Sequence, residues 1–198
     1  MISSLSRLTD FKTCPDREIF ERDRINKFEA AHTEPLHKLS RVGHQQDWYR
    51  LIQLQHLGCP TRLIDWSIDN LTAMYFATNN FEKDGALFSI PVFWNHRTWE
   101  ELQDTDPYNL PEPMMITPVV SSSLGKEFPG LRNLTHQMGK FFVAPISYSH
   151  IPIEQLSICE GLISKIIITK EAKQDIRNSL GFDEAFIYSH LSSKLSNL

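Results

Sequence analysis

The stretch QHLGCPTRLIDW, residues 55–66, lies between two segments with helical patterns. Apolar residues recur at helical spacing before it, in residues 48–57, and after it, in residues 70–77. Gly58 suits the left-handed position that follows a helix end, and Pro60 prevents the helix from resuming. The stretch therefore predicts a helix end, a short turn, an extended piece and then the start of a second helix.

Four polar side chains are concentrated in this turn: His56, Thr61, Arg62 and Asp65. Two interpretations are open, a buried hydrogen-bond network or a functional site. The spacing of Arg62 and Asp65 predicts that they interact, and that the guanidinium keeps the carboxylate ionised. In the functional interpretation, Arg62 presents its planar group to a phosphate or a carboxylate. His56 is expected at a helix C-terminus, where the helix dipole favours the charged imidazole.

Residues 55–66 resemble the central motif of the FRG-domain family, Q-H-x-G-x-P-T-R-L-L-D-W. The following segment, NLTAMYFA at residues 70–77, resembles the helix that comes next in that family. A later segment, QMGKF at residues 137–141, resembles the family's Q-x-G-x-F block. The Phe/Tyr-Arg-Gly motif that names the family is not found in this chain. Members of the family occur in bacteria and phages, and some are associated with toxin or defence systems.

The motif order of the family is similar to that of ADP-ribosyltransferases. The resemblance therefore implies an NAD-dependent ADP-ribosyltransferase or an NAD glycohydrolase-like enzyme, acting on a protein or nucleotide substrate. Its implied catalytic residues are His56, Arg62, Asp65 and Gln137. Its implied cofactor-binding residues are Thr61, Arg62, Trp66 and Tyr75. Because a Gln cannot act as a general base, chemistry at Gln137 would rest on positioning and charge stabilisation.

The alternative function is a non-catalytic protein-interaction module, a degenerate FRG domain. The family's name-giving motif is missing, and Asp65 beside Arg62 is not expected to have the raised pKa of a general base. The acidic, proline-rich segment 104–113 is predicted to be an exposed loop that contacts a protein partner.

Composition limits the other functions. The chain has 198 residues, which fits one domain spanning residues 1–198, and its net charge of −4 predicts no general nucleic-acid surface. No apolar run is long enough to span a bilayer, and no signal peptide is recognised, so we expect no membrane association. The three cysteines are widely spaced and predict reduced thiols in a cytoplasmic protein. No cluster has the spacing of metal ligands, so no metal is expected.

The remaining pattern predicts an α+β fold. Helices are expected mainly in the N-terminal half and a small mixed or antiparallel sheet mainly in the C-terminal half. The helix at residues 70–77, with Asp69 as its N-cap, is apolar nearly all round and is expected to be buried between layers. Residues 162–169 form the clearest candidate for a buried strand. Thr169 is expected to cap a helix that ends at Gly181. The resemblance adds that the fold is ADP-ribosyltransferase-like.

Overall fold

The computed structural model describes residues 1–198 except residues 2, 9–12, 32–42, 92–93, 118–138 and 184–198. It confirms the α+β fold, with two helices first and most strands later. The helices in the described residues are α1 (Cys14–Ala31), α2 (Gln45–His56), α3 (Asn70–Ala77) and α6 (Lys170–Leu180). The strands are β1 (Ile64–Ser67), β2 (Gly85–Ser89), β3 (His96–Arg97), β4 (Met114–Ile116), β5 (Gly139–Val143) and β6 (Ser164–Ile168).

The larger sheet has the strand order β1-β5-β4-β3. Strand β5 lies antiparallel to both β1 and β4, and β3 is parallel to β4. Successive side chains of a strand point to opposite faces, so this sheet has two apolar faces. Phe141 packs with α2 residues such as Trp48 and Leu51, whereas Phe142 packs in a separate cluster with Ile64. The sheet is therefore the centre of the core.

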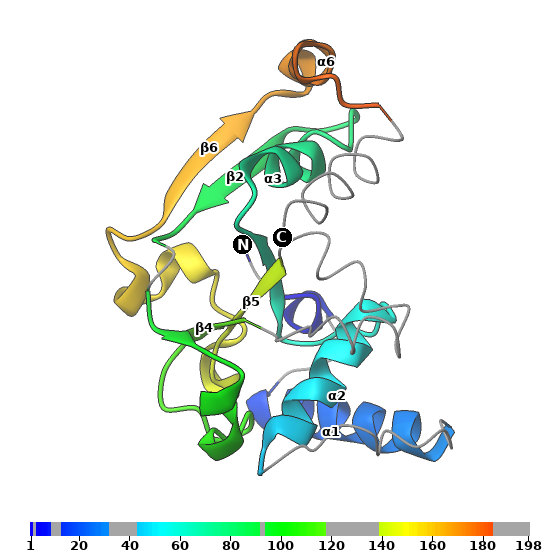
Figure 1. Cartoon of the computed structure of the whole chain (residues 1–198), viewed down its shortest axis with the longest axis vertical. Coiled ribbons are helices and arrows are strands. Elements are labelled where there is room, and N and C mark those ends of the chain that lie inside the picture. Colours follow the sequence, from blue (N-terminus) through cyan, green and yellow to red (C-terminus); the bar gives the residue numbers. More distant parts are fainter. Residues whose placement is uncertain (2, 9–12, 32–42, 92–93, 118–138, 184–198) are drawn as a thin grey trace.

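The second sheet is a ribbon of two antiparallel strands, β2 and β6 (Figure 1). The prediction that β6 is buried is wrong, because Ile166 is 60% exposed and Ile167 is 54% exposed. Helix α3 is likewise less buried than its composition predicts: Phe76 is 52% exposed, and Thr72 is the helix's buried residue. A run of apolar residues does not specify how many layers pack against it, and in the described part of the chain this ribbon is covered only in part.

The local end signals of the helices are confirmed. Gly58 has a φ of +77° just beyond α2, and Gly181 has a φ of +66° at the end of α6. Asp69 accepts a hydrogen bond from the backbone N–H of Thr72, at 2.9 Å, and thereby caps α3. Thr169 caps α6 in the same way. Gly58 marks the end of α2 and the start of the turn, and Asp69 sets where α3 begins after β1.

Most of the segment 104–113 is a loop, as its composition predicts, but the loop is exposed only in part. Pro107 and Pro113 are buried, and Leu110 is 8% exposed within the core beside α2. The half-buried ring of Tyr108 lies under the Arg22 guanidinium of α1, 3.6 Å from its carbon. Pro107, Leu110 and Pro113 therefore serve packing, whereas Pro111 and Glu112 remain exposed.

Gly85 allows the end of α3 and the start of β2 to approach closely. A Cβ at this position would lie 2.2 Å from the carbonyl oxygen of Ala77. Because a backbone atom cannot move aside, we expect Gly85→Ala to lower the free energy of unfolding by about 3 kcal/mol in urea titrations. At Gly161 a Cβ meets nothing within 4 Å, and there Gly161→Ala should cost about 1 kcal/mol, from its positive φ alone. Equal losses for the two variants would contradict this close approach.

Candidate functional site

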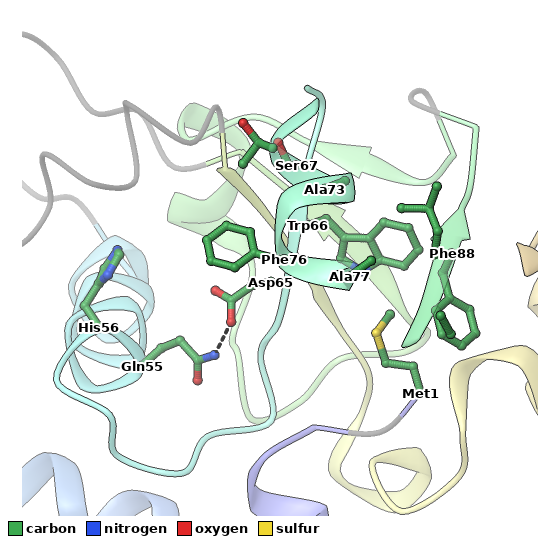
Figure 2. Close-up of a pocket in the computed structure, with 13 residues that line it drawn as sticks. Met1, Gln55, His56, Asp65, Trp66, Ser67, Ala73, Phe76, Ala77 and Phe88 are labelled. Carbon is green, nitrogen blue, oxygen red and sulfur yellow. Dashed lines mark hydrogen bonds between the residues drawn. The ribbon is translucent and has the colours of Figure 1, made fainter. Parts of the chain in front are cut away.

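A cavity of about 550 Å³ lies where the central motif meets α3 and the ribbon (Figure 2). Helix α2 contributes its last turn, β1 contributes three successive residues, and α3 and β2 form the other walls. The volume suits a small molecule, since ligand pockets commonly span about 300–1,000 Å³. The lining residues are Met1, Gln55, His56, Asp65, Trp66, Ser67, Thr72, Ala73, Phe76, Ala77, Ala86, Leu87 and Phe88.

Arg62 does not belong to this cavity. Its side chain is fully buried, and its Nε lies 3.0 Å from Oε2 of Glu21 on α1. The other carboxylate oxygen of Glu21 accepts the backbone N–H of Arg62 at 3.1 Å, and the guanidinium also donates to the carbonyl of Pro107. The predicted interaction between Arg62 and Asp65 is therefore wrong. The partner of Arg62 comes from a helix 41 residues earlier, which local spacing does not reveal.

Asp65 faces the cavity from β1. Its Oδ2 accepts a hydrogen bond from Nε2 of Gln55 at 2.7 Å. Although the side chain is open to the cavity, the surrounding walls displace water, and this desolvation raises the pKa of Asp65. The hydrogen bond from Gln55 and the charge of His56 act in the opposite direction. The expectation that Arg62 holds Asp65 ionised is thus replaced by a carboxylate that binds its proton more readily than usual.

His56 lies on the same side of the cavity as Gln55 (Figure 2). Burial lowers the pKa of His56, and the negative charge of Asp65 opposes that shift. The sequence-based expectation of a charged imidazole is wrong in direction, because loss of hydration outweighs the helix dipole here. Its Nε2 is buried and has no hydrogen-bond partner among the described residues. A neutral imidazole with a free ring nitrogen can bind a ligand group or accept a proton.

The rest of the lining is largely apolar and aromatic. Trp66, Phe76 and Phe88 bring rings from three different elements to the cavity. The indole Nε1 of Trp66 is buried without a partner in the described part of the chain. No Arg or Lys occurs among the described lining residues. The cavity thus combines one carboxylate, one imidazole and aromatic surfaces, a combination suited to a flat cation.

The other predicted site residues have different positions. Thr61 is fully buried behind the cavity, where its hydroxyl donates to Oε1 of Gln55 at 2.6 Å. Tyr75 does not line the cavity, and its ring contacts Phe182 and the guanidinium of Arg177. Gln137 lies outside the described residues. Of the predicted set, the structure therefore brings His56, Asp65 and Trp66 together.

Two kinds of cavity residue were not predicted from the sequence. Gln55 is part of the motif, but nothing in its type distinguishes a satisfied core amide from a partner of Asp65. Phe76 and Phe88 look like ordinary core residues of a helix and a strand. No signal in one sequence separates an aromatic residue that lines a cavity from one that fills the core.

Residues 1–85 match the sequence model of the FRG domain. These first 85 of the 198 residues are similar to the FRG domain. The matched segment includes all lining residues from α2, β1 and α3, whereas those of β2 follow directly after it. The matched segment therefore provides most of the cavity wall. No curated protein and no solved structure matches the chain.

No described helix is both long and apolar enough to cross a membrane. No group of three or more His, Cys, Asp or Glu side chains is arranged to hold a metal ion within the ranges given above.

Proposed function

We propose that the cavity binds the nicotinamide and the adjoining ribose of NAD. The protein cleaves the bond between these two groups, by transfer to an acceptor or by hydrolysis. The observation that carries this proposal is Asp65, a carboxylate of raised pKa that faces an aromatic cavity with no Arg or Lys in its described lining. The match of residues 1–85 to the FRG domain supports the proposal, because the motif order of that family is similar to that of ADP-ribosyltransferases.

The nicotinamide ring of oxidised NAD is a flat cation, and its charge complements this lining. A pyridinium ring is attracted to the face of Trp66 or Phe76, with a contribution of about 0.5–2 kcal/mol for such a contact. The carboxylate of Asp65 adds attraction from β1. The free Nε2 of His56 and Nε1 of Trp66 supply hydrogen bonds for the carboxamide or the ribose hydroxyls.

The bond-breaking step uses the same carboxylate. The bond between C1′ and nitrogen breaks with its electron pair moving to nitrogen, so nicotinamide leaves as a neutral molecule. Positive charge then develops on the ribose, as in other glycosidic cleavages, and ionised Asp65 stabilises it. The oxygen of water or of an acceptor alcohol bonds to C1′ and releases a proton, which Asp65 or neutral His56 accepts.

Arg62 has no role in this proposal beyond folding. Its guanidinium is paired with Glu21 and Pro107 and is not available to phosphate groups. This assignment differs from the one that the family resemblance implies, in which Arg62 binds the cofactor.

The proposal is tested by incubating the purified protein with NAD and measuring released nicotinamide by chromatography. We expect turnover, and we expect NAD to raise the melting temperature of the protein. Ala73→Leu, which adds volume to the α3 wall, should reduce turnover at least tenfold while the protein stays folded. Ala172→Leu on α6, away from the lining, is the matched control. Absence of both turnover and stabilisation by NAD would contradict the proposal.

A second function is supported by a different observation. Ile166 and Ile167 on β6 and Phe76 on α3 are exposed apolar side chains, which favours a protein-interaction module. The two functions differ in their response to Ile167→Glu. An enzyme whose activity depends on the cavity alone keeps its NAD turnover in that variant, because Ile167 does not line the cavity.

A further inference from the structure

Behind the cavity, three hydrogen bonds form a chain that ends on Asp65. The backbone N–H of Leu63 donates to Oγ1 of Thr61 at 3.2 Å. The hydroxyl of Thr61 donates to Oε1 of Gln55 at 2.6 Å, and Nε2 of Gln55 donates to Oδ2 of Asp65 at 2.7 Å. The last of these bonds is visible in Figure 2.

The direction of this chain is fixed at its start. A backbone N–H can only donate, so Leu63 occupies one lone pair of the Thr61 oxygen. Thr61 is fully buried, and Gln55 is the acceptor that its hydroxyl hydrogen reaches. If the amide of Gln55 were reversed, that hydrogen would lose its acceptor, and two oxygens would face each other at Asp65. Burial makes such an unpaired hydroxyl costly.

The backbone of Thr61 is held equally firmly. The hydroxyl oxygen of Ser4 accepts the N–H of Thr61 at 3.1 Å and donates to its carbonyl at 3.0 Å. The N–H of Leu5 donates to the same carbonyl at 3.0 Å. The start of the hydrogen-bond chain therefore has little freedom to shift relative to β1.

We propose that Thr61 and Gln55 are positioning residues: Thr61 orients the amide of Gln55, and the amide holds one oxygen of Asp65 as an acceptor. Gln55 then leaves the other oxygen, Oδ1, unoccupied. The arrangement also favours the ionised carboxylate. The amide N–H of Gln55 can donate to an ionised Oδ2, but it cannot accept a hydrogen bond from a protonated one. The effect on catalysis rests on the proposed function, whereas the effect on Asp65 itself does not.

Few other charges act on Asp65. His56 faces it from α2, and Lys140 of β5 lies opposite Trp66, the next residue of β1. The lining residues from α3 and β2 are uncharged. The amino group of Met1 is paired with Glu154. Among the described residues, Gln55 is thus the side chain whose hydrogen bond lowers the pKa of Asp65.

The test compares Thr61→Val, which keeps the shape but removes the hydroxyl, with Thr61→Ser, which keeps the hydroxyl. The pKa of Asp65 is measured by NMR titration of its ¹³C-labelled carboxyl group. We expect Thr61→Val to raise this pKa, because Gln55 is then free to turn away, and Thr61→Ser to leave it near the wild-type value. With NAD, Thr61→Val should lower kcat about tenfold and move the acidic limb of the pH profile upward.

Gln55→Met provides a second route to the same result if Thr61→Val does not fold. Gln55 is only half-buried, and Met retains its length while removing the donor. It should raise the pKa of Asp65, and adding Thr61→Val to it should change little more, since both act through one bond. An unchanged pKa in Gln55→Met would overturn the proposal. A raised pKa of Asp65 in these variants would support the positioning role of Thr61 and Gln55 even if the wild-type protein did not turn over NAD. Absence of turnover would then refute only the enzyme function.

Discussion

Asp65→Asn is expected to lower the rate of nicotinamide release by about 10²- to 10⁴-fold, the range typical of a lost acid–base or charge-stabilising group. Asn has the same shape, and its side-chain oxygen can still accept the hydrogen bond from Gln55. What it lacks is the negative charge that stabilises the developing cation on the ribose. The measurement is kcat for NAD at saturating concentration, with Glu82→Gln, an exposed residue outside the lining, as the control.

The same substitution should make the folded protein more stable at neutral pH. Burial raises the pKa of Asp65 above its ordinary value of 3.8, so the ionised form is less favourable in the folded than in the unfolded chain. This cost is absent below pH 3.8, grows as pH rises through the folded pKa, and is complete above it. Asp65→Asn should therefore raise the urea midpoint at pH 7, and its advantage should shrink toward pH 4. A variant that loses both activity and stability would indicate a structural role for Asp65.

Arg62→Ala is expected to lower the free energy of unfolding by about 3–5 kcal/mol, because breaking a buried ion pair leaves an uncompensated charge. The charge left behind is Glu21, which is 1% exposed. The carbonyl of Pro107 loses its donor as well, and Tyr108 loses the guanidinium 5.1 Å from its ring. Urea titration followed by circular dichroism measures the loss.

The contrast with an exposed pair makes this prediction specific. Lys27 and Asp23 form an ion pair on the exposed part of α1, so Lys27→Ala should cost less than about 1 kcal/mol. Replacing both Glu21 and Arg62 with Met should recover much of the stability lost in Arg62→Ala, because apolar residues avoid the cost of burying charge. If Arg62→Ala costs no more than Lys27→Ala, the buried pair does not stabilise the fold.

The features predicted correctly from the sequence depend on neighbouring residues. An N-cap such as Asp69 or Thr169 acts on the first turn of its own helix, and Gly58 acts on the helix end just before it. The burial of β6 depends instead on which other elements cover the ribbon. Glu21 as the partner of Arg62 depends on how α1 packs against the turn, and neither fact is present in a local pattern.

Only part of the candidate site was predicted from the sequence. His56 and Asp65 were found because polar residues gathered in a short turn between apolar helices are unusual. The directions of their pKa shifts were not predicted, because desolvation depends on how the folded chain packs around each side chain. Phe88 was missed for a related reason: its position in the cavity follows from the pairing of β2 with β6, a contact made 77 residues further along the chain.

Arg62 and Asp65 are three positions apart in the motif, yet one faces the core and the other faces the cavity. Selection on the two positions is therefore expected to differ. A relative without catalytic activity still requires the arginine at the position of Arg62 in order to fold. It gains stability when the aspartate at the position of Asp65 is replaced. In a family alignment, an intact Thr-Arg pair followed by a substituted aspartate would then mark the copies that persist as folded, inactive proteins.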